Sequence, residues 1–316
     1  MTKLYLSAFL FLFLFSVSSY GSERYDGPII DMHLHAYDDQ TYWGPIPHFR
    51  TGKKSPPSAT EFESEMIRTL DNNRVVLGML SSTSVELSKH WDDKYPGRFL
   101  KGLNFNDPSN ELSEKVFEEH IQKGNIEVVG EVMAQYHGLS PSDDKYSPYW
   151  KIAEQHGVPV GIHTGEGPSG IVYRSTPKFR VKLGDPLLLE DMLVEFPKLK
   201  VYVMHAGGFF YPRMLQLMQM YPQVYVEVGV LGHVKQHRDM ETMKKFIQGA
   251  KTMGYLDRVM FGSDQMVWPD AITDSINFVQ EMDFLTVEEK QMIFYDNAAR
   301  FLELDQETIK KHKAQF

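Results

Sequence analysis

The stretch at residues 28–36, PIIDMHLHA, gives the first indication of the fold. A short apolar run leads into Asp31, and two histidines, His33 and His35, follow with one leucine between them. Side chains two residues apart on a strand point to the same side, so His33 and His35 would face one centre while Leu34 points away. The spacing favours a paired site for a cation at the end of a buried strand, although one such pair is a weak signal by itself.

Seven further apolar runs follow, at intervals that leave room for helices. They lie at residues 74–82, 98–105, 126–134, 158–165, 199–208, 223–230 and 257–264. Helical patterns separate them, starting at Ser58, covering 109–123, 148–156, 187–196, 211–220 and 238–253, and starting again at Thr286. The apolar residues of the runs are mostly continuous, as expected for parallel strands that are covered on both faces.

Eight strands that alternate with helices predict a parallel sheet, either an open doubly wound sheet or a closed barrel. The count of eight and the chain length favour an α/β fold of the (β/α)8 type, the TIM-type barrel, for which roughly 250 residues are typical. No linker rich in proline, glycine or serine divides the chain. Residues 22–316 are therefore expected to form one barrel domain.

The composition excludes several classes of protein. The formal net charge of −9 argues against a general nucleic-acid binder, which would present a basic face. The chain has no cysteine, so disulfides, thiolate metal sites and a cysteine nucleophile are excluded. A hydrophobic content of 42% is enough to form a core.

The N-terminal segment has the pattern of an export signal. Lys3 precedes an apolar run at residues 4–17, and small and polar residues follow. We predict a signal peptide at residues 1–21 and a periplasmic or secreted mature protein. An uncleaved membrane anchor is the alternative, but a run of fourteen residues falls short of the roughly 20 that a spanning helix needs. No stable membrane span is therefore expected after cleavage.

Six side chains that can bind metals are expected at the carboxyl ends of five strands: His33, His35, Glu131, His163, His205 and Asp264. In a barrel these strand ends converge on one site. Imidazole and carboxylate ligands without thiolate suit a catalytic zinc ion, or manganese or iron. Such an ion lowers the pKa of bound water to about 7, and Asp264 would accept the proton of the attacking water.

Each of these residues also has a plainer explanation. A lone histidine is more often a satisfied core residue than a ligand, Glu131 could serve in a salt bridge, and Asp264 could cap a helix. The joint position of all six at one end of the predicted barrel is what favours a metal site.

The remaining candidates are substrate contacts. The long loops at residues 37–57 and 166–186 follow the first and fifth strands and would overhang the site. Candidate contacts are Trp43, His48 and Arg50 on the first loop, Arg174 and Arg180 on the second, and Trp268 as a pocket wall. Solvated surface charge is the alternative for the loop residues. The histidines outside the predicted site are expected at the surface: His48, His90, His120, His137, His156, His233 and His237.

Together these motifs resemble the amidohydrolase superfamily, and more narrowly the amidohydrolase-related branch with aminocarboxymuconate-semialdehyde decarboxylase and metal-dependent lactonases. The matching segments are DMHLHA (31–36), GEV (130–132), GIHTG (161–165), VMHAGG (203–208), FGSD (261–264) and DNAARFLEL (296–304). The resemblance implies a (β/α)8 barrel with a C-terminal closing helix and a divalent metal bound by His33, His35, His163 and Asp264. It further implies that His205 polarises water or substrate, and that the chain forms a homodimer.

Glu131 departs from the pattern of the decarboxylase-like members. Two-metal branches of the superfamily place a carboxylated lysine or a glutamate on the fourth strand. The resemblance thus leaves two alternatives open, a second ion held by His163 and His205 with Glu131 as the bridge, or a Glu131 outside the ligand set.

Three functions follow, all with a small-molecule substrate. The first is an exported metal-dependent hydrolase of an ester, lactone or amide. The second is a non-oxidative decarboxylase of a carboxylated ring with the same metal set. The third, a non-catalytic ligand-binding barrel, is disfavoured because His205 and Asp264 are both retained.

Overall fold

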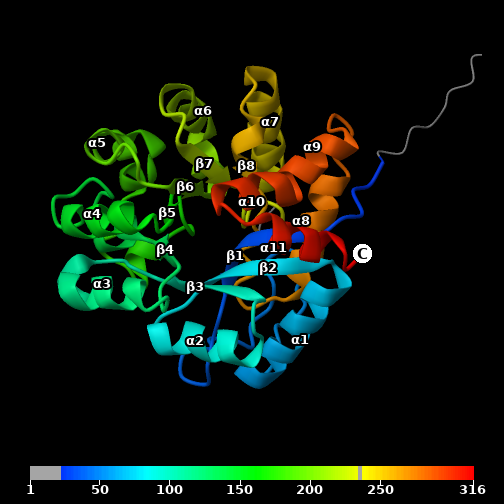
Figure 1. Cartoon of the computed structure of the whole chain (residues 1–316), viewed down its shortest axis with the longest axis horizontal. Coiled ribbons are helices and arrows are strands. Elements are labelled where there is room, and N and C mark those ends of the chain that lie inside the picture. The colour runs from blue at the N-terminus through cyan, green and yellow to red at the C-terminus, as the bar shows by residue number, and fades with distance from the viewer. Residues whose placement is uncertain (1–22, 234–236) are drawn as a thin grey trace, which may run out of the picture.

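The computed structural model describes residues 23–233 and 237–316, and the predicted signal peptide lies outside this part of the chain. Eight parallel strands follow one another in the order of the sequence around a barrel (Figure 1). They are β1 (Ile29–His35), β2 (Val75–Ser81), β3 (Phe99–Leu103), β4 (Val128–Val132), β5 (Val160–His163), β6 (Val201–Met204), β7 (Val224–Glu227) and β8 (Val259–Met260). The backbone bonds from Met32 N to Phe261 O, 3.0 Å, and from Asp264 N to His33 O, 2.9 Å, connect the segment directly after β8 to β1. The barrel is thus nearly closed, and the prediction of a parallel barrel of the TIM type is confirmed.

Helices surround the strands. They are α1 (Ala59–Asn72), α2 (Val85–Lys94), α3 (Glu114–Gln122), α4 (Ser147–His156), α5 (Glu190–Glu195), α6 (Tyr211–Met220), α7 (His237–Met253), α8 (Asp270–Gln280), α9 (Val287–Gln291), α10 (Asn297–Phe301) and α11 (Gln306–Lys313). The cap predicted at Ser58 forms, because its side chain accepts from Glu61 N, and Thr286 forms a complete capping box with Glu289. No helix among the described residues is both long and apolar enough to cross a bilayer.

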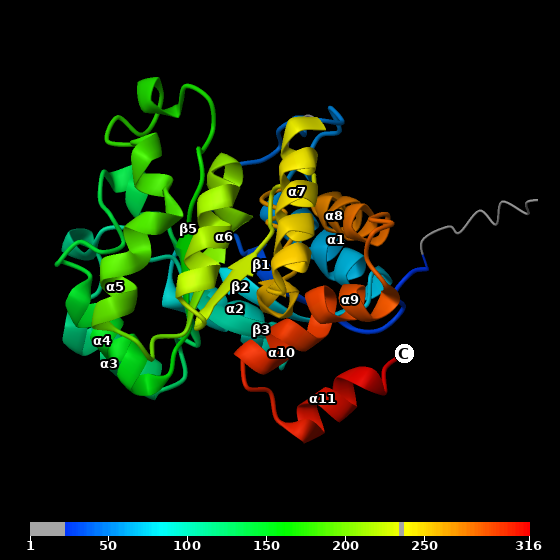
Figure 2. The ribbon, with the colours of Figure 1, turned by 90° about the horizontal axis from the view of Figure 1, so that it is seen from above.

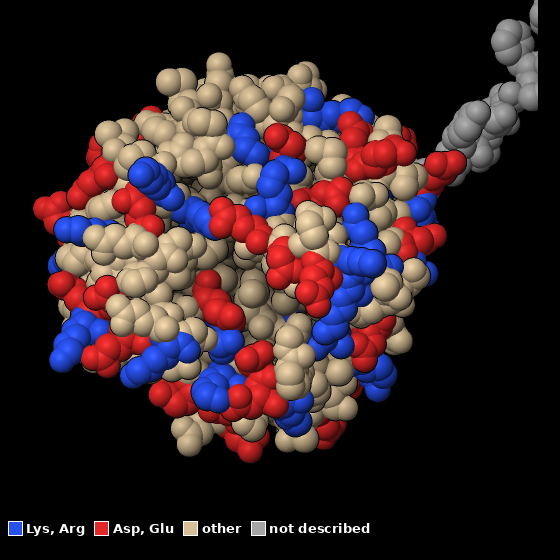
Figure 3. Space-filling view, in the orientation of Figure 1, with Lys and Arg blue, Asp and Glu red and all other residues tan. Residues whose placement is uncertain are grey.

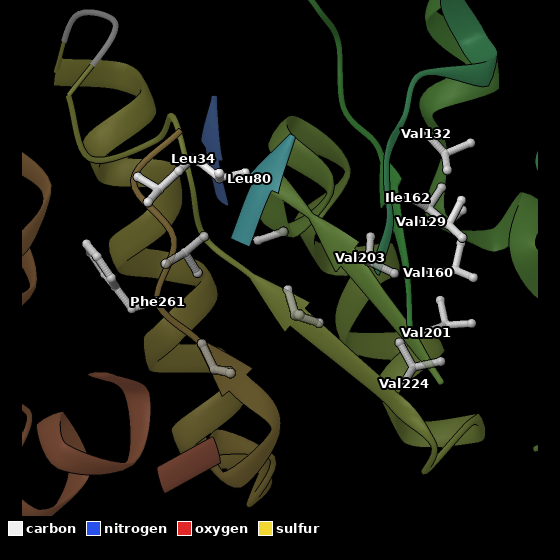
Figure 4. Packing of buried hydrophobic residues seen from close by; sticks show 14 of the residues in the cluster. Leu34, Leu80, Val129, Val132, Val160, Ile162, Val201, Val203, Val224 and Phe261 are labelled. Carbon is white, nitrogen blue, oxygen red and sulfur yellow. The ribbon is translucent and has the colours of Figure 1, made fainter. Parts of the chain in front are cut away.

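Two apolar layers hold the barrel. An outer cluster packs the strands against the helices, and in Figure 4 Val160 and Val201, which are paired on adjacent strands, lie next to each other within it. An inner cluster fills the lower part of the barrel and packs against α10, with Ile30, Met32 and Tyr202 among its members. Both faces of the strands are therefore buried, which explains their continuous apolar runs.

A shift in strand pairing between Asp31 and Leu34 brings the two histidines to the site. Met32 packs into the inner cluster, whereas Leu34 packs into the outer one. Irregularities of this kind re-aim side chains and are frequent next to active sites. His33 and His35 can thus face the mouth of the barrel although Met32 fills its interior.

The two ends of the barrel differ. Figure 2 shows α10 and α11 at one end, and the loops that follow β1 and β5 at the opposite end. The face that carries α10 and α11 shows basic and acidic residues interspersed (Figure 3). The open end, with the two loops, is the end at which the strands terminate and the candidate residues gather.

Candidate metal centre

The first group of candidate ligands comes from β1 and the segment after β8. His35 Nε2 lies 2.8 Å from Asp264 Oδ1, and His33 Nε2 lies 3.7 Å from the same oxygen. The Asp264 backbone has a φ of 47°, a left-handed conformation that is uncommon for residues other than glycine and that concentrates at functional sites. This backbone turn aims the Asp264 carboxylate back at the two histidines of β1.

The second group comes from β4, β5 and the turn after β6. His163 Nδ1 contacts Glu131 Oε1, and His205 Nε2 lies 3.2 Å from that oxygen and 3.0 Å from His163 Nδ1. The opposite ring nitrogen of His205 donates to Gly229 O over 3.1 Å, which leaves Nε2 directed at the group. Three side chains from three strands therefore converge on one small volume.

Glu131 stands between the two groups. Its Oε1 faces His163 and His205, while its Oε2 lies 3.6 Å from His33 Nε2. The side chain is buried, with 4% of the residue exposed. One carboxylate is thus shared by both sets of potential ligands.

The buried charges are mutually compensated. Burial by itself would raise the pKa of Glu131, but the imidazoles of His163 and His205 outweigh it and hold the pKa well below its usual range. Burial would likewise raise the pKa of Asp264, and the imidazoles of His33 and His35 lower it instead. Both carboxylates are therefore ionised at neutral pH.

The histidines respond in different ways. Burial lowers the pKa of His33, but the Asp264 and Glu131 carboxylates raise it well above its ordinary value. Burial also lowers the pKa of His205, but the Glu131 and Asp264 carboxylates outweigh it and raise this pKa above its ordinary value. For His163 the effect of burial prevails and lowers the pKa. The carboxylates of this site thus favour a positive charge at its centre.

The residues fit a divalent metal. The ligand atoms of His33, His35 and Asp264 lie within 4.8 Å of one another, as do those of Glu131, His163 and His205. Among the described residues, the buried Nε2 atoms of His33 and His163 have no hydrogen-bond partner. Buried polar atoms rarely remain unpaired, and imidazole with carboxylate is the donor set of catalytic zinc, manganese or iron sites. The structure therefore brings together all six residues that the sequence placed at the strand ends.

A seventh side chain, Glu227 at the end of β7, was missed by the sequence analysis. It is fully buried, and its Oε2 accepts from His33 Nδ1 over 3.3 Å. Its Oε1 accepts from Gly229 N, and a Cβ at Gly229 or at Gly262 would overlap this oxygen. Two glycines thus leave the space that the carboxylate occupies beneath the candidate ligands.

A cavity of about 580 Å³ lies above the site, and two of the predicted substrate contacts line it. Arg174 and Trp43 line it, and His163, His205 and Asp264 form part of its floor. Arg180 does not line this cavity but is exposed, with its guanidinium on the backbone oxygens of Pro177 and Phe179.

Trp268 lies behind the cavity wall rather than in it. Its ring packs edge-on against Trp43 and Phe49, at centroid distances of 5.9 and 5.2 Å, and both of these line the cavity. Trp268 Nε1 donates to Ile46 O over 3.1 Å. Trp268 therefore supports the wall that the loop after β1 provides.

The expectation that His48 and His233 lie at the surface is wrong. His233 is fully buried and His48 is 5% exposed, because their rings pack together behind Asp264. His233 Nε2 donates to the backbone oxygens of Ser263 and Asp264, at 2.9 Å each, and His48 Nε2 lies 3.3 Å from His233 Nδ1. The side chain of His237 lies outside the described part of the chain. His48 is thus a support of the site and not a residue of the main cavity.

A (β/α)8 barrel with histidines and carboxylates at its open end defines a class of metal-dependent enzymes. The sequence matches the amidohydrolase family over residues 30–304, and the chain therefore belongs to this family. No curated protein matches the sequence.

Solved structures share the fold at low sequence identity. A probable 2-pyrone-4,6-dicarboxylic acid hydrolase from Acinetobacter baumannii, with citric acid bound, is 18% identical with a TM-score of 0.61, covering 87% of this chain and 99% of its own. The 5-carboxyvanillate decarboxylase from Sphingomonas paucimobilis is 14% identical with a TM-score of 0.58, covering 88% of this chain and 99% of its own. An uncharacterised TIM-barrel protein from Bordetella bronchiseptica is 20% identical with a TM-score of 0.65, covering 87% of this chain and 98% of its own. At these identities the similarity establishes the fold.

Proposed function

We propose that the chain is a metal-dependent hydrolase that cleaves an ester, lactone or amide bond of a small molecule and binds two divalent ions. The position of Glu131 carries this proposal, since its two oxygens face the two groups of histidines. His33, His35 and Asp264 would hold one ion, and His163 and His205 the other. Zinc is the first candidate, with manganese and iron as alternatives. When bound, such ions lower the pKa of water and polarise a carbonyl group.

The protein's own groups would move the protons and hold the substrate. Asp264 lines the cavity, and its Oδ2 lies 4.0 Å from His205 Nδ1 while Oδ1 is engaged by His35. Because Asp264 is ionised at neutral pH, Oδ2 can accept the proton of the attacking water and pass it to the leaving group.

Tyr136 would supply a hydrogen bond to the substrate oxygen. It lies in the turn Ala134–His137 after β4, and its ring packs edge-on against His163 at a centroid distance of 5.3 Å. Burial, reinforced by the Glu131 and Asp264 carboxylates, raises the pKa of the phenol, so it remains a donor. Tyr136 lines the cavity, where its hydroxyl can donate to the developing negative charge of the acyl group.

Elemental analysis of protein purified without chelator tests the bridged site. Two ions per chain that fall to one in Glu131→Gln are expected, and the exposed Glu86→Gln on α2 serves as the matched control. One ion per chain, unchanged in Glu131→Gln, would contradict the bridge. No retained ion, and none taken up from added zinc or manganese, would contradict the metal site as a whole.

Decarboxylation of a carboxylated ring is the second candidate. The observation in its favour is the shared fold with 5-carboxyvanillate decarboxylase, which has a TM-score of 0.58. The products separate the two reactions. Release of CO2 would indicate decarboxylation, whereas formation of a new carboxylate without CO2 indicates hydrolysis.

We also propose that the protein is exported to the periplasm or secreted. The apolar run at residues 4–17 supports this, although it lies outside the described residues. Mass spectrometry of the protein from its native host should give an N-terminus near Ser22. An intact Met1 or a fully cytoplasmic pool would contradict export.

A further inference from the structure

The wall of the cavity above the metal site is mainly apolar, although Tyr136, Thr164, Ser169 and Ser175 also line it. Its side chains come from the loops after β1, β5, β7 and β8. They include Trp43, Phe49, Ile171, Val230, Leu231 and Met266. A substrate that reaches the floor residues His163, His205 and Asp264 must pass these groups.

Apart from the candidate metal ligands, the described lining residues include one acidic and one basic side chain. Glu166 Oε2 accepts from Phe209 N over 3.1 Å and rests against Gly208, where a Cβ would overlap it. Arg174 is exposed, and its Nη2 donates to Ser169 O over 2.6 Å. The lining therefore offers an anionic substrate one solvated cation at the mouth and a carboxylate within the wall.

This wall is unfavourable for a charged substrate. A carboxylate that leaves water needs charged or hydrogen-bonding partners, and arginine in a bidentate pair is the usual one. An ionised group lodged among Ile171, Leu231 and Met266 would lose its hydration without that compensation, and Glu166 would repel it. The solved hydrolase with the shared fold is named for a dicarboxylic acid, a substrate for which this cavity has no matching set of cations.

We propose that the substrate is an uncharged ester, lactone or amide whose bulk is an apolar ring or branched aliphatic group. This inference rests on the hydrolase function proposed above and names its substrate class. The rim agrees with it, because the lining residues Trp43 and Phe49 are 43% and 62% exposed. Exposed aromatic side chains around a cavity mouth give contact area to an apolar substrate that extends beyond the floor.

A matched pair of aryl lactones tests the proposal with the metal-loaded enzyme. Dihydrocoumarin and a carboxylated dihydrocoumarin differ by one charge. We expect kcat/KM to be at least about 10-fold higher for the uncharged lactone, because the wall offers the added carboxylate only the exposed Arg174 as a cation. Equal values, or a preference for the carboxylated lactone, would overturn the inference and leave the hydrolase function standing.

A variant pair isolates the cause. Ile171→Arg adds a cation to the wall at a half-buried loop position, and Ile171→Gln adds a polar group of similar length without charge. Ile171→Arg should raise kcat/KM for the carboxylated lactone by about 10-fold relative to the uncharged one, whereas Ile171→Gln should not. An identical response of both variants would contradict the role of the missing cation.

A binding measurement keeps the inference testable if neither lactone is hydrolysed, an outcome that would count against the proposed function. Tetralone has the shape of dihydrocoumarin without a hydrolysable bond. Quenching of tryptophan fluorescence should show tighter binding of tetralone than of its carboxylated form, since Trp43 lines the cavity. Tighter binding of the carboxylated form would overturn the inference whether or not any lactone is cleaved.

Discussion

Glu227 accepts a hydrogen bond from His33 Nδ1, and this contact leaves Nε2 as the ligand atom that points at the site. Histidines that bind metals commonly donate their other ring nitrogen to a carboxylate, which fixes the ring and increases its basicity. The glycines at positions 229 and 262 admit this carboxylate, since a Cβ at either would overlap it. Glu227 is therefore expected to act on the metal through His33.

Replacement of Glu227 by leucine should lower metal affinity about 10–100-fold, the usual cost of losing such a partner. Equilibrium competition with a chromophoric chelator measures this without an activity assay. Gly262→Ala should weaken binding in the same direction, because the new methyl group displaces the carboxylate. Gly249→Ala, which meets only Leu215 away from the site, is the control. Unchanged affinity in Glu227→Leu would show that His33 needs no such support.

Tyr136→Phe tests the proposed hydrogen bond to the substrate. Loss of one preorganised donor to a developing oxyanion typically costs about 10²–10³ in kcat, and we expect a fall of that order with little change in KM. Metal content should stay the same, because the phenol contacts the site through its ring. Tyr173→Phe, at an exposed tyrosine, is the matched control. A fall in metal content, or an equal loss in both variants, would argue against the role as a donor.

At the level of single residues, six candidate ligands could be predicted because each stands where an apolar strand ends. Glu227 could not, because the run at residues 223–230 was expected to continue to Val230 and would have placed Glu227 inside a strand. The strand ends at Glu227, and Val230 has a φ of 64° that no strand residue adopts. A carboxylate between apolar residues, followed by a glycine, was the signal that a shorter strand was needed.

Several polar contacts hold the loop at residues 42–55 against α8 and against His233. Arg50 pairs with Asp274 and Lys53 with Asp270, both on α8. His233 Nε2 is a donor to two backbone oxygens, so His233 Nδ1 must accept the hydrogen bond of His48 Nε2. This chain of contacts connects the loop to the backbone of Asp264, and it requires His233 to be neutral.

Acid should therefore destabilise the protein through His233. Burial lowers its pKa to about 4, so below its ordinary pKa of 6.5 the unfolded chain takes up a proton that the folded chain refuses. The contribution of neutral His233 to the free energy of unfolding is complete above about pH 6.5, and roughly 3 kcal/mol of it is lost as the pH falls to about 4.

Urea unfolding of chelated protein at a series of pH values measures this loss. His233→Asn should lack this component of the pH dependence, and the exposed His90→Asn should retain it. Parallel curves for His233→Asn and the wild type would contradict the assignment.

Elements with a clear apolar period were predictable, whereas the helices α2, α8 and α11 were not. The expected helix at 211–220 coincides with α6, and the one at 238–253 begins one residue earlier as α7. Helix α2 was not predicted, because VELSKHWDDK buries only Val85, Leu87, Ser88 and Trp91 and is otherwise polar. Helix α8 was missed as well, and its contacts with α1 and with the loop at 42–55 come from distant segments. Tertiary contacts of this kind leave no local pattern in a sequence.

At the scale of the whole molecule, the barrel separates stability from chemistry. Its lower interior is filled by the inner apolar cluster and covered by α10, whose Asn297 donates to backbone oxygens at the start of β8. Its open end contains the buried carboxylates and histidines and the cavity. The cavity wall consists of loops that the apolar core does not require, so the loops can determine the substrate while the core determines stability.

Removal of metal should lower the melting temperature, and by less in acid. A ligand that binds only the folded state stabilises it by roughly 3 kcal/mol per site at a hundredfold excess over Kd. Without metal, protonated His33 and His205 balance part of the negative charge of Asp264 and Glu131. Burial lowers the pKa of both histidines, but these carboxylates raise it above the ordinary value. Because protons and metal compete for the same imidazoles, the difference in melting temperature between loaded and chelated protein should shrink as the pH falls from about 8 to about 6.

Calorimetry with zinc and with EDTA at each pH measures this difference. A difference that stays constant or grows as the pH falls would show that metal does not bind through these histidines.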